Sequence, residues 1–447
     1  MYNDKRKKIA LLSNYSWPYM SAEVAKRYFP NDNLTLITKK MPKVIVKRHD
    51  FGMEVIELSS AGSTVFKNIR FDTLIIDQGF SLQIAILLLT GRFKEIFLID
   101  LDKPQNPIQP ITRLIFLKNL MMKLPYFLNK ILSHISKKLK LSVCFGQPSE
   151  IFIETAAVCN LKCKACPTGL GQLNRPCEFM APQLFNEMVK NNRRNFKYLD
   201  IVNPFLFGEP LLNKHIFEYI KILRKETPPY TRIELHTNGN IDNSRDAAAK
   251  LVETGLDMVS ISLDGADCSS YESFRQGGNF ALACEFIKAL TKAKKEKKFL
   301  KPEIVIQMIL TRYSEDQIDA FKRLRDELGV DRILFKEYFH EFTMLTDREG
   351  YALAPTKKEL SLTEEEKKGL IDRKKNLCGW VYRTVCISSN GEIAPCCIDF
   401  NISLLGGLNV RASDIRKLWN SEKYKRLRKD MLSGSIDMCN KCFLGGY

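Results

Sequence analysis

Short apolar runs that end in polar residues recur along the first hundred residues of the chain. Five such runs are separated by stretches long enough to hold a helix, a pattern typical of strands that alternate with helices. This alternation favours a small parallel α/β sheet. The sequence therefore predicts a Rossmann-like α/β domain over 1–108, with strands at Ile9–Ser13, Leu34–Thr38, Val55–Leu58, Thr73–Asp77 and Glu95–Asp100.

The turn after the first of these strands, SNYSWPYM, contains no glycine, so the dinucleotide-binding fingerprint is absent. The domain also lacks the Asp-x-His-x-x-Gly signature of cobalamin-binding domains. No ligand is therefore predicted for 1–108. Binding of a sugar nucleotide, binding of a partner and a purely structural role all remain open.

Residues 109–141 form a basic stretch in which apolar residues recur at roughly helical spacing. The stretch holds seven lysines and arginines and no acidic residue, and Pro125 in its middle predicts two helices rather than one. A helix with an apolar and a cationic face can lie in a membrane interface. The other interpretation is a pair of helices packed on the N-terminal sheet with solvated lysines. We expect a helical connector over 109–148, with peripheral membrane contact left open.

A strand followed by a helix is repeated six times between residues 149 and 340, which predicts a partial (β/α)6, TIM-like barrel. The active groups of such barrels lie at the C-terminal ends of the strands. We expect strands at Glu150–Thr155, Tyr198–Val202, Arg232–His236, Met258–Leu263, Glu303–Leu310 and Arg332–Lys336, and helices near 182–194, 214–226, 243–254, 280–298 and 315–328. Residues 341–372 hold Pro355 and a charge run, and are expected to be a linker with a surface helix.

Three cysteines follow the first barrel strand directly, in the sequence CNLKCKACP. The spacing of Cys159, Cys163 and Cys166 allows one tight loop to bring three thiolates to one centre. A four-iron cluster normally takes four cysteine ligands, so three would leave one iron without a protein ligand. A three-thiolate zinc site and three unrelated cysteines are the alternatives.

This cysteine loop resembles that of the radical S-adenosylmethionine (radical SAM) enzymes. The resemblance implies a 4Fe–4S cluster whose open iron binds S-adenosylmethionine, and a reduced cluster that splits it to a 5′-deoxyadenosyl radical, which takes a hydrogen atom from a substrate. It also implies an electron donor such as flavodoxin or ferredoxin. The loop departs from many members at Ala165, where they carry an aromatic residue that packs near the adenine.

Other residues expected at the same barrel rim agree with this resemblance. The segment FGEPLLN after the second strand resembles the superfamily's GEP motif, which binds the amino group of S-adenosylmethionine. The predicted cofactor-binding residues are Gly208, Glu209 and Pro210 of this motif, with Thr237, Asn238, Ser262 and Asp264 after the third and fourth strands. Turn formation by the Asn-Gly and Asp-Gly pairs is the alternative role. Gln307 and Phe335 to Glu337 are weaker candidates for contact with cofactor or substrate, and no catalytic acid or base is assigned.

Six further cysteines gather in the tail, 373–447, where CISSNGEIAPCC predicts a hairpin around Asn390-Gly391. The tail resembles the SPASM or twitch extension of radical SAM enzymes, which carries auxiliary iron–sulfur clusters. Because only FLGGY follows the last CxxC, the resemblance is to the shorter, single-cluster arrangement. It implies Cys378, Cys396, Cys439 and Cys442 as ligands of a second 4Fe–4S cluster. Cys386 and Cys397 compete for these positions, and a zinc ribbon is the alternative site.

Composition limits the class of protein. An odd number of cysteines, 13, in CxxxCxxC and CxxC spacings argues for metal or cluster ligands over disulfides. Cys144, Cys177, Cys268 and Cys284 are expected to be core or surface thiols. The net charge of +18 is not accompanied by an RNA-binding motif or zinc-finger spacing, so no nucleic acid partner is expected. No signal peptide or membrane span is found, and a reducing cytoplasm is the expected location.

Three functions remain after these steps. The preferred one is a radical SAM enzyme that acts by oxidation or elimination on a small polar substrate such as a sugar, amino sugar or sugar nucleotide. The alternative enzyme is a maturase that modifies a peptide or protein. The absence of a recognisable peptide-binding domain in 1–148 favours the small molecule. A protein of another class, an iron–sulfur electron carrier or structural protein, has no use for the three-cysteine loop and GEP motif on one rim.

Overall fold

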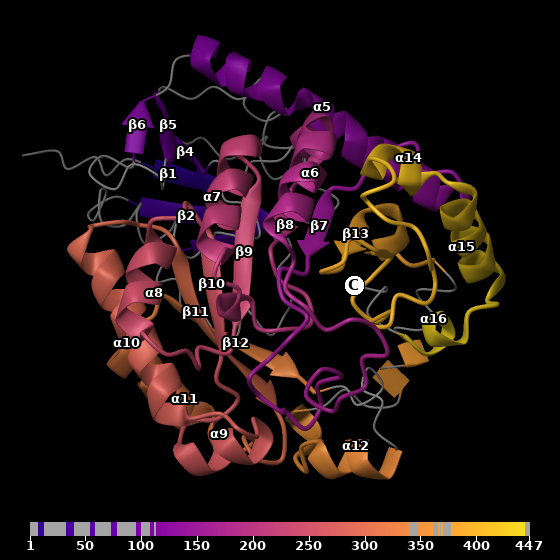
Figure 1. The fold of residues 1–447 in the computed structure, drawn as a ribbon. Coiled ribbons are helices and arrows are strands. Elements are labelled where there is room, and N and C mark those ends of the chain that lie inside the picture. The colour runs from indigo at the N-terminus through magenta and orange to yellow at the C-terminus, as the bar shows by residue number, and fades with distance from the viewer. Residues whose placement is uncertain are drawn as a thin grey trace, which may run out of the picture. The chain divides into compact units, whose positions relative to one another are not determined.

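The computed structural model describes six strands within residues 8–110 and the ranges 113–338, 347–360, 365–366, 368–369 and 377–442. Side chains are described from residue 124 on, except at 347, 348 and 351. The chain divides into two compact units, 1–127 with 298–300, and 128–297 with 301–447. Figure 1 shows the elements of both units.

The first unit contains a six-stranded sheet in the order β3-β2-β1-β4-β5-β6. Strands β1 to β5 run parallel, and β6 pairs antiparallel with β5. The order 3-2-1-4-5 is that of Rossmann-type sheets, so the predicted fold class of this region is confirmed. The strands are β1 Lys8–Leu12, β2 Asn33–Lys39, β3 Glu54–Leu58, β4 Thr73–Asp77, β5 Glu95–Ile99 and β6 Ile108–Pro110.

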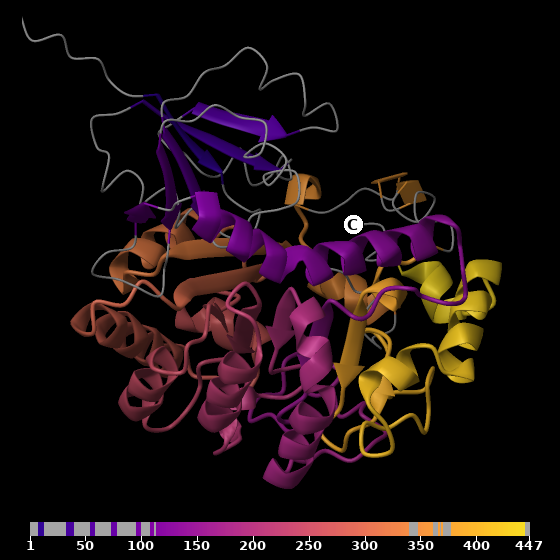
Figure 2. The same ribbon diagram turned by 90° about the horizontal axis from the view of Figure 1, so that it is seen from above.

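The connector forms one helix, α5 (Arg113–Lys138), with Pro125 inside it. The prediction of two helices is therefore wrong. A proline removes one backbone hydrogen bond at a cost of about 3 kcal/mol, which packing along the rest of a long helix can offset. Figure 2 shows α5 as one continuous element.

In the second unit, polar residues of α5 face the protein. The Asn129 side-chain amide donates to the Gln147 carbonyl oxygen at 2.9 Å, and Ser136 is fully buried. The apolar side chains Leu128, Ile131, Leu132, Ile135 and Leu139 are exposed instead. No helix of the described residues is both long and apolar enough to cross a membrane. Peripheral membrane contact through 109–141 stays a prediction.

The second unit is built on an eight-stranded sheet in the order β12-β11-β10-β9-β8-β7-β13-β14. Its six parallel barrel strands lie within a few residues of the predicted ones: β7 Glu150–Ile153, β8 Ile201–Asn203, β9 Arg232–Thr237, β10 Met258–Ser262, β11 Glu303–Leu310 and β12 Arg332–Glu337. The predicted partial barrel is confirmed.

Helices cover the outer face of these strands, as Figure 1 shows. Alternation along β9 explains the packing: Ile233 and Leu235 are fully buried in the main core, whereas Glu234 and His236 point to the other face. The helices are α6 Pro182–Asn192, α7 Ile216–Glu226, α8 Ser244–Val252, α9 Cys268–Phe274, α10 Phe280–Glu296 and α11 Ile318–Leu328, with 3-10 helices at Arg193–Tyr198 and Pro210–Leu212. Helix α9 was not predicted.

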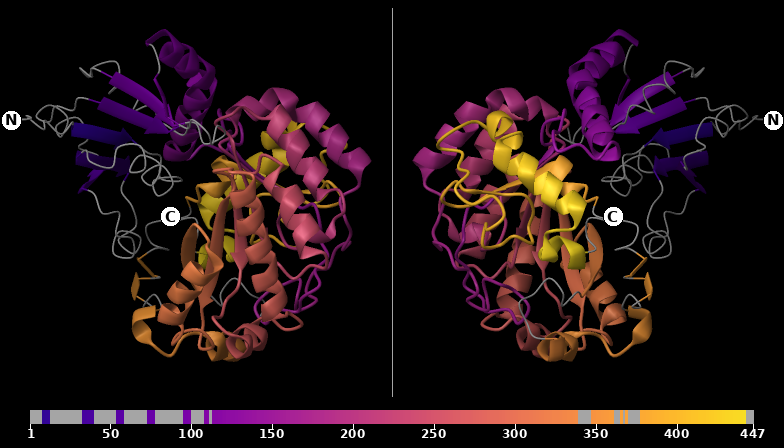
Figure 3. Two further views of the ribbon diagram at one scale, coloured as in Figure 1. Left: turned by 90° about the vertical axis from the view of Figure 1, so that its left-hand side faces the viewer. Right: turned by 90° about the vertical axis from the view of Figure 1, so that its right-hand side faces the viewer.

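The C-terminal segment continues the barrel sheet. β13 (Thr384–Ile387) pairs parallel with β7 and antiparallel with β14 (Ile393–Ala394), so the predicted hairpin is present. Figure 3 shows this segment, in yellow, within the second unit. Its helices are α14 Ile415–Trp419, α15 Glu422–Ser433 and α16 Asp437–Lys441, preceded by the 3-10 turn Trp380–Tyr382. The predicted linker contains α12 (Asp347–Leu353) and a 3-10 turn, Lys358–Leu360; most of its expected surface helix lies outside the described residues.

Candidate active site at the barrel rim

The loop that carries Cys159, Cys163 and Cys166 leaves the C-terminal end of β7, at the rim where barrel active sites lie. Gly208 of the GEP segment packs directly against this loop. A Cβ atom at Gly208 would lie 2.3 Å from the Ala156 carbonyl oxygen, so only glycine fits there. The next residue, Glu209, donates its backbone N–H to the Val158 carbonyl oxygen at 2.8 Å. The cysteine loop and the GEP segment thus pack against each other and share a backbone hydrogen bond.

Polar hydrogen-bond donors surround the sulfur atoms of this loop. The Leu161 backbone N–H lies 3.4 Å from the Cys159 sulfur, and the Asn238 side-chain amide lies 3.7 Å from it. The Arg275 guanidinium approaches the Cys163 sulfur at 3.8 Å. Burial raises the pKa of the Cys163 thiol to about 12, against the opposing effect of the Arg275 charge. These donors are placed to stabilise thiolates once the loop binds a metal centre.

Glu209 has a buried carboxylate that accepts hydrogen bonds from uncharged donors. It accepts hydrogen bonds from the Thr237 hydroxyl at 2.6 Å and from the backbone N–H groups of Asn238 at 2.7 Å and Leu211 at 3.0 Å. Burial raises its pKa. No lysine or arginine of the described residues forms an ion pair with it, so the site fits an ammonium group supplied by a ligand. Pro210, also buried, begins the short 3-10 helix that follows.

An asparagine network joins the third strand to the cysteine loop. The Asn238 side chain donates to Asn160 at 2.9 Å, and Asn160 donates to the Asn240 carbonyl oxygen at 2.6 Å. Asn240 in turn donates to the Tyr271 hydroxyl at 2.6 Å. Asn238 therefore lies beside Cys159, whereas Thr237 bonds Glu209, and the contact of both with the cofactor stays a prediction. The sequence analysis missed Asn160, Asn240 and Tyr271.

Ser262 and Asp264 lie at the same rim but have partners within the protein. The Ser262 hydroxyl accepts a hydrogen bond from Gln307 at 2.6 Å. Asp264 is fully buried and has a positive φ of 54°; its carboxylate forms an ion pair with Arg275 and accepts from the Ile309 backbone N–H at 2.6 Å. Direct contact of Asp264 with the cofactor stays a prediction. The full burial of this side chain does not support it. The structure gives it another role, because it positions Arg275 beside Cys163.

A row of aromatic rings joins Trp380 of the C-terminal segment to residues of the barrel strands β7 and β9. The rings of Trp380 and Phe152 are stacked with centroids 5.8 Å apart, and Phe152 meets Phe205 edge-on at 5.8 Å. Phe205 stacks on the His236 ring at 4.5 Å. Burial lowers the pKa of His236 well below its ordinary value, so this imidazole is neutral at pH 7. Lys336 of β12 lies within the electrostatic reach of His236.

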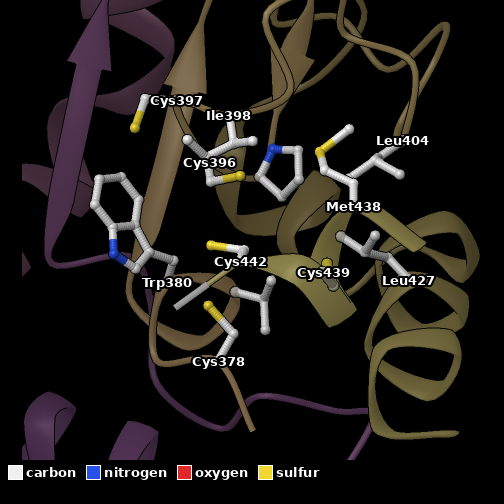
Figure 4. A pocket seen from close by; sticks show the side chains of 12 residues that line it. Cys378, Trp380, Cys396, Cys397, Ile398, Leu404, Leu427, Met438, Cys439 and Cys442 are labelled. Atoms are coloured by element: carbon white, nitrogen blue, oxygen red, sulfur yellow. The ribbon is translucent and has the colours of Figure 1, made fainter. Parts of the chain in front are cut away.

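The tail cysteines line a second, apolar pocket, drawn in Figure 4. Five of the tail cysteines line it: Cys378, Cys396, Cys397, Cys439 and Cys442. Its other lining residues include Trp380, Leu404, Leu427 and Met438. Burial raises the pKa of the Cys396 thiol well above its ordinary value. Cys386 is buried on β13 outside the lining, so it is a poorer candidate ligand than the four predicted cysteines.

The donor sets of both regions fit iron–sulfur clusters. None of the thirteen cysteines, all of which are described, forms a disulfide. No three Cys, His, Asp or Glu side chains of the described residues converge closely enough to ligate one metal ion. A four-iron cluster takes one thiolate per iron and is larger than a single ion, so it suits more widely spaced thiols. The ligand sets themselves stay predictions.

Comparison with known families agrees with this arrangement. Residues 153–324 match the Radical SAM superfamily, and residues 378–443 match the SPASM iron-sulfur cluster-binding domain. The chain therefore belongs to the radical SAM superfamily and carries a C-terminal SPASM domain. These matches confirm the predicted cofactors, S-adenosylmethionine and two 4Fe–4S clusters.

Curated relatives of the chain include proteins of several activities. The probable GTP 3′,8-cyclase of Pyrococcus horikoshii is 30% identical over 188 residues, 42% of this chain and 55% of that protein. The mycofactocin maturase of Mycolicibacterium smegmatis is 24% identical over 311 residues, 64% of this chain and 74% of that protein. The AdoMet-dependent heme synthase of Methanosarcina barkeri is 25% identical over 334 residues, which are 65% of this chain and 88% of that protein.

The chain thus spans about half the length of the cyclase and more of the maturase and synthase. Among solved structures, Streptococcus suis SuiB bound to precursor peptide SuiA matches with a TM-score of 0.49 and 17% identity, covering 66% of this chain and 69% of that one.

Proposed function

We propose that this chain is a radical SAM maturase that modifies a peptide or protein. The match to mycofactocin maturases carries the proposal. It extends over 64% of the chain, and it recurs in maturases of three mycobacterial species. The preference for a sugar or other small polar substrate finds no support in the names of these relatives, so the alternative from the sequence analysis is the better interpretation.

The cofactor supplies the difficult chemistry: when bound and reduced, the rim cluster provides the electron that splits S-adenosylmethionine to a 5′-deoxyadenosyl radical. The residues of the chain bind and orient. Cys159, Cys163 and Cys166 are the proposed cluster ligands, and Glu209 holds the ammonium of the cosubstrate. Arg275, fixed by Asp264, keeps a positive charge beside the Cys163 sulfur. An external donor such as flavodoxin or ferredoxin would supply the electron.

The C-terminal pocket is proposed to hold the second cluster through Cys378, Cys396, Cys439 and Cys442. Its position follows from the fold, since β13 pairs with β7, the strand that carries the rim loop. Glu154 strengthens this junction, because its carboxylate accepts two hydrogen bonds from Arg175 and one from the Ser389 backbone N–H. The two cysteine regions are therefore fixed with respect to each other on one sheet.

The test is a cleavage assay on the anaerobically reconstituted protein. Dithionite and S-adenosylmethionine are added, and 5′-deoxyadenosine is measured alone and with short peptides encoded beside the gene. We expect a peptide to stimulate cleavage and to change in mass. Stimulation by GTP, by a tetrapyrrole or by a sugar instead would refute the maturase, and no 5′-deoxyadenosine under any condition would favour an electron carrier.

A further inference from the structure

Most of the charged side chains that the structure describes inside the barrel are paired. In the layer nearest the N-terminal ends of the strands, Arg232 bonds Glu234 at 3.0 Å and Arg332 bonds Glu303 at 2.7 Å. Near the rim, Arg275 and Asp264 form a buried pair. Each of these pairs cancels its own charge, so none attracts a further ion strongly.

Lys336, like Glu209 at the rim, forms no ion pair with another described residue. It lies on β12, where Phe335 points outward and meets Phe321 of α11 with the two rings tilted and their centroids 5.8 Å apart, so that Lys336 points to the inside. Its register partner on β11 is Ile309, whose N–H bonds Asp264. No hydrogen bond or ion pair joins the Lys336 ammonium to any described residue. The carboxylates that act on it, Asp264 and Glu234, already hold Arg275 and Arg232.

An ammonium without a partner is costly in this setting. Burial lowers the pKa of Lys336, which means that desolvation outweighs the attraction of the surrounding carboxylates. The neighbouring imidazole of His236 is neutral, so it provides no counter-charge for the ammonium. A cation left in such surroundings is stabilised when an anion is brought to it.

We propose that Lys336 binds a carboxylate of the substrate inside the barrel, above the aromatic row of Phe152, Phe205 and His236. This assignment concerns the substrate of the proposed maturase. The second of the two experiments below therefore rests on the maturase function. One ammonium balances the single charge of a carboxylate. A phosphate carries nearly two charges and several acceptor oxygens, and would call for more donors than this site has unpaired. The carboxylate is a peptide C-terminus or an acidic side chain.

The first experiment needs no substrate. The unfolding temperature of the reconstituted protein is measured in sodium chloride, sodium acetate and sodium phosphate at equal ionic strength, for the natural chain and for Lys336→Met, Lys336→Arg and the exposed control Lys292→Met. Removal of an unpaired cation should raise the unfolding temperature of Lys336→Met by roughly 2 °C or more in chloride. Acetate should stabilise the natural chain and not Lys336→Met.

Three results would overturn the proposal. Loss of stability in Lys336→Met would mean that Lys336 has a partner within the protein. Stabilisation by phosphate alone would point to a phosphorylated substrate. A fall in the affinity of Lys336→Met for S-adenosylmethionine, measured by equilibrium dialysis, would assign Lys336 to the carboxylate of the cosubstrate. Lys292→Met should match the natural chain throughout.

The second experiment uses a peptide that the cleavage assay has identified. Replacing its C-terminal carboxylate by an amide, or each acidic residue by its amide in turn, should raise KM for one peptide by about 30-fold or more with the natural chain. The same change should have little effect with Lys336→Met, and Lys336→Arg should restore part of the discrimination. Equal losses in both proteins would refute the contact. If no peptide is turned over, the proposed function fails while the acetate result still stands.

Discussion

The two cysteine regions of this protein differ in what surrounds the sulfur atoms. At the rim, a backbone N–H, an amide and a guanidinium lie within 3.8 Å of the Cys159 or Cys163 sulfur. In the C-terminal pocket, the walls between the cysteines are Trp380, Val381, Leu404, Leu427 and Met438. One region is built of polar donors and the other of apolar side chains, although both display CxxC spacing.

This difference separates two uses of the same ligand. Hydrogen bonds to sulfur, charge and solvent exposure set the reduction potential of iron–sulfur clusters. Three thiolates in a polar, partly exposed loop suit a cluster that takes up a ligand, and Glu209 lies beside that loop. Four thiolates in an apolar pocket suit a cluster that is closed to substrate. The surroundings, rather than the cysteine spacing, therefore distinguish the two sites.

The strongest test of this comparison removes one cysteine from each region. Cys163→Ala should abolish 5′-deoxyadenosine formation, because the rim cluster would lose one of three protein ligands. Cys396→Ala should keep cleavage of S-adenosylmethionine while losing modification of the substrate. Iron analysis should fall from about eight to about four per chain in either variant. Retained cleavage in Cys163→Ala, or its complete loss in Cys396→Ala despite a folded rim site, would remove the distinction.

Much of the fold that carries these sites could be predicted from the sequence. The six barrel strands have strong apolar runs, and β11 (Glu303–Leu310) was predicted with its observed bounds. The short helix α9 was missed, because Cys268–Phe274 is only seven residues long and lacks a clear apolar period. Arg275, which follows it, was therefore missed as well. A residue that acts on Cys163 from 112 positions away leaves no local signal in the sequence.

The second test removes the charge that the rim places beside sulfur. Arg275→Met would leave the fully buried Asp264 carboxylate without its cation, which costs about 3–5 kcal/mol in buried pairs. We expect a lower unfolding temperature and a weaker cluster signal at the rim, with the pocket cluster unchanged. Circular dichroism during heating and the absorption of the reconstituted cluster provide the measurements.

Two controls accompany this test. Arg275→Lys keeps a charge but loses the forked geometry, so it should recover part of the stability. The double variant Arg275→Met with Asp264→Asn removes both charges and should be more stable than Arg275→Met alone. If Arg275→Met were as stable as the natural chain, Asp264 would not depend on Arg275.

The third test concerns cosubstrate affinity at the rim. Glu209→Gln removes the negative charge and turns one accepting atom into a donor, which cannot accept from the Asn238 N–H. Hydrogen bonds to charged groups contribute about 1.5–3 kcal/mol, so S-adenosylmethionine should bind roughly 10- to 150-fold more weakly. Thr237→Val keeps the carboxylate and removes one donor, and should cost less. Equilibrium dialysis under anaerobic conditions measures both, and equal affinities for all three proteins would argue against the ammonium site.

Other parts of the candidate site could not be read from sequence for a physical reason. The tail cysteines were found by spacing, but spacing does not say which side of a strand a thiol faces or what apolar walls enclose it. The same limit applies to His236, and to Lys336, which the sequence offers only within the weaker candidates Phe335 to Glu337. The two share the barrel interior only because four parallel strands place them there. The pairing of charges, which leaves Lys336 without an ion-pair partner among the described residues, exists only in the folded chain.

The smallest effect is expected at Cys397, which adjoins the predicted ligand Cys396. Both thiols line the pocket, and Figure 4 draws Cys397 to the side of Cys396. The two cysteines lie in a bend and a turn rather than in a strand, and the family resemblance assigns the cluster to Cys396. Cys397→Ala should therefore keep about eight irons per chain and full cleavage of S-adenosylmethionine, while Cys396→Ala loses about four. The reverse result would exchange the two ligands, since the apolar walls would then enclose a cluster held by Cys397.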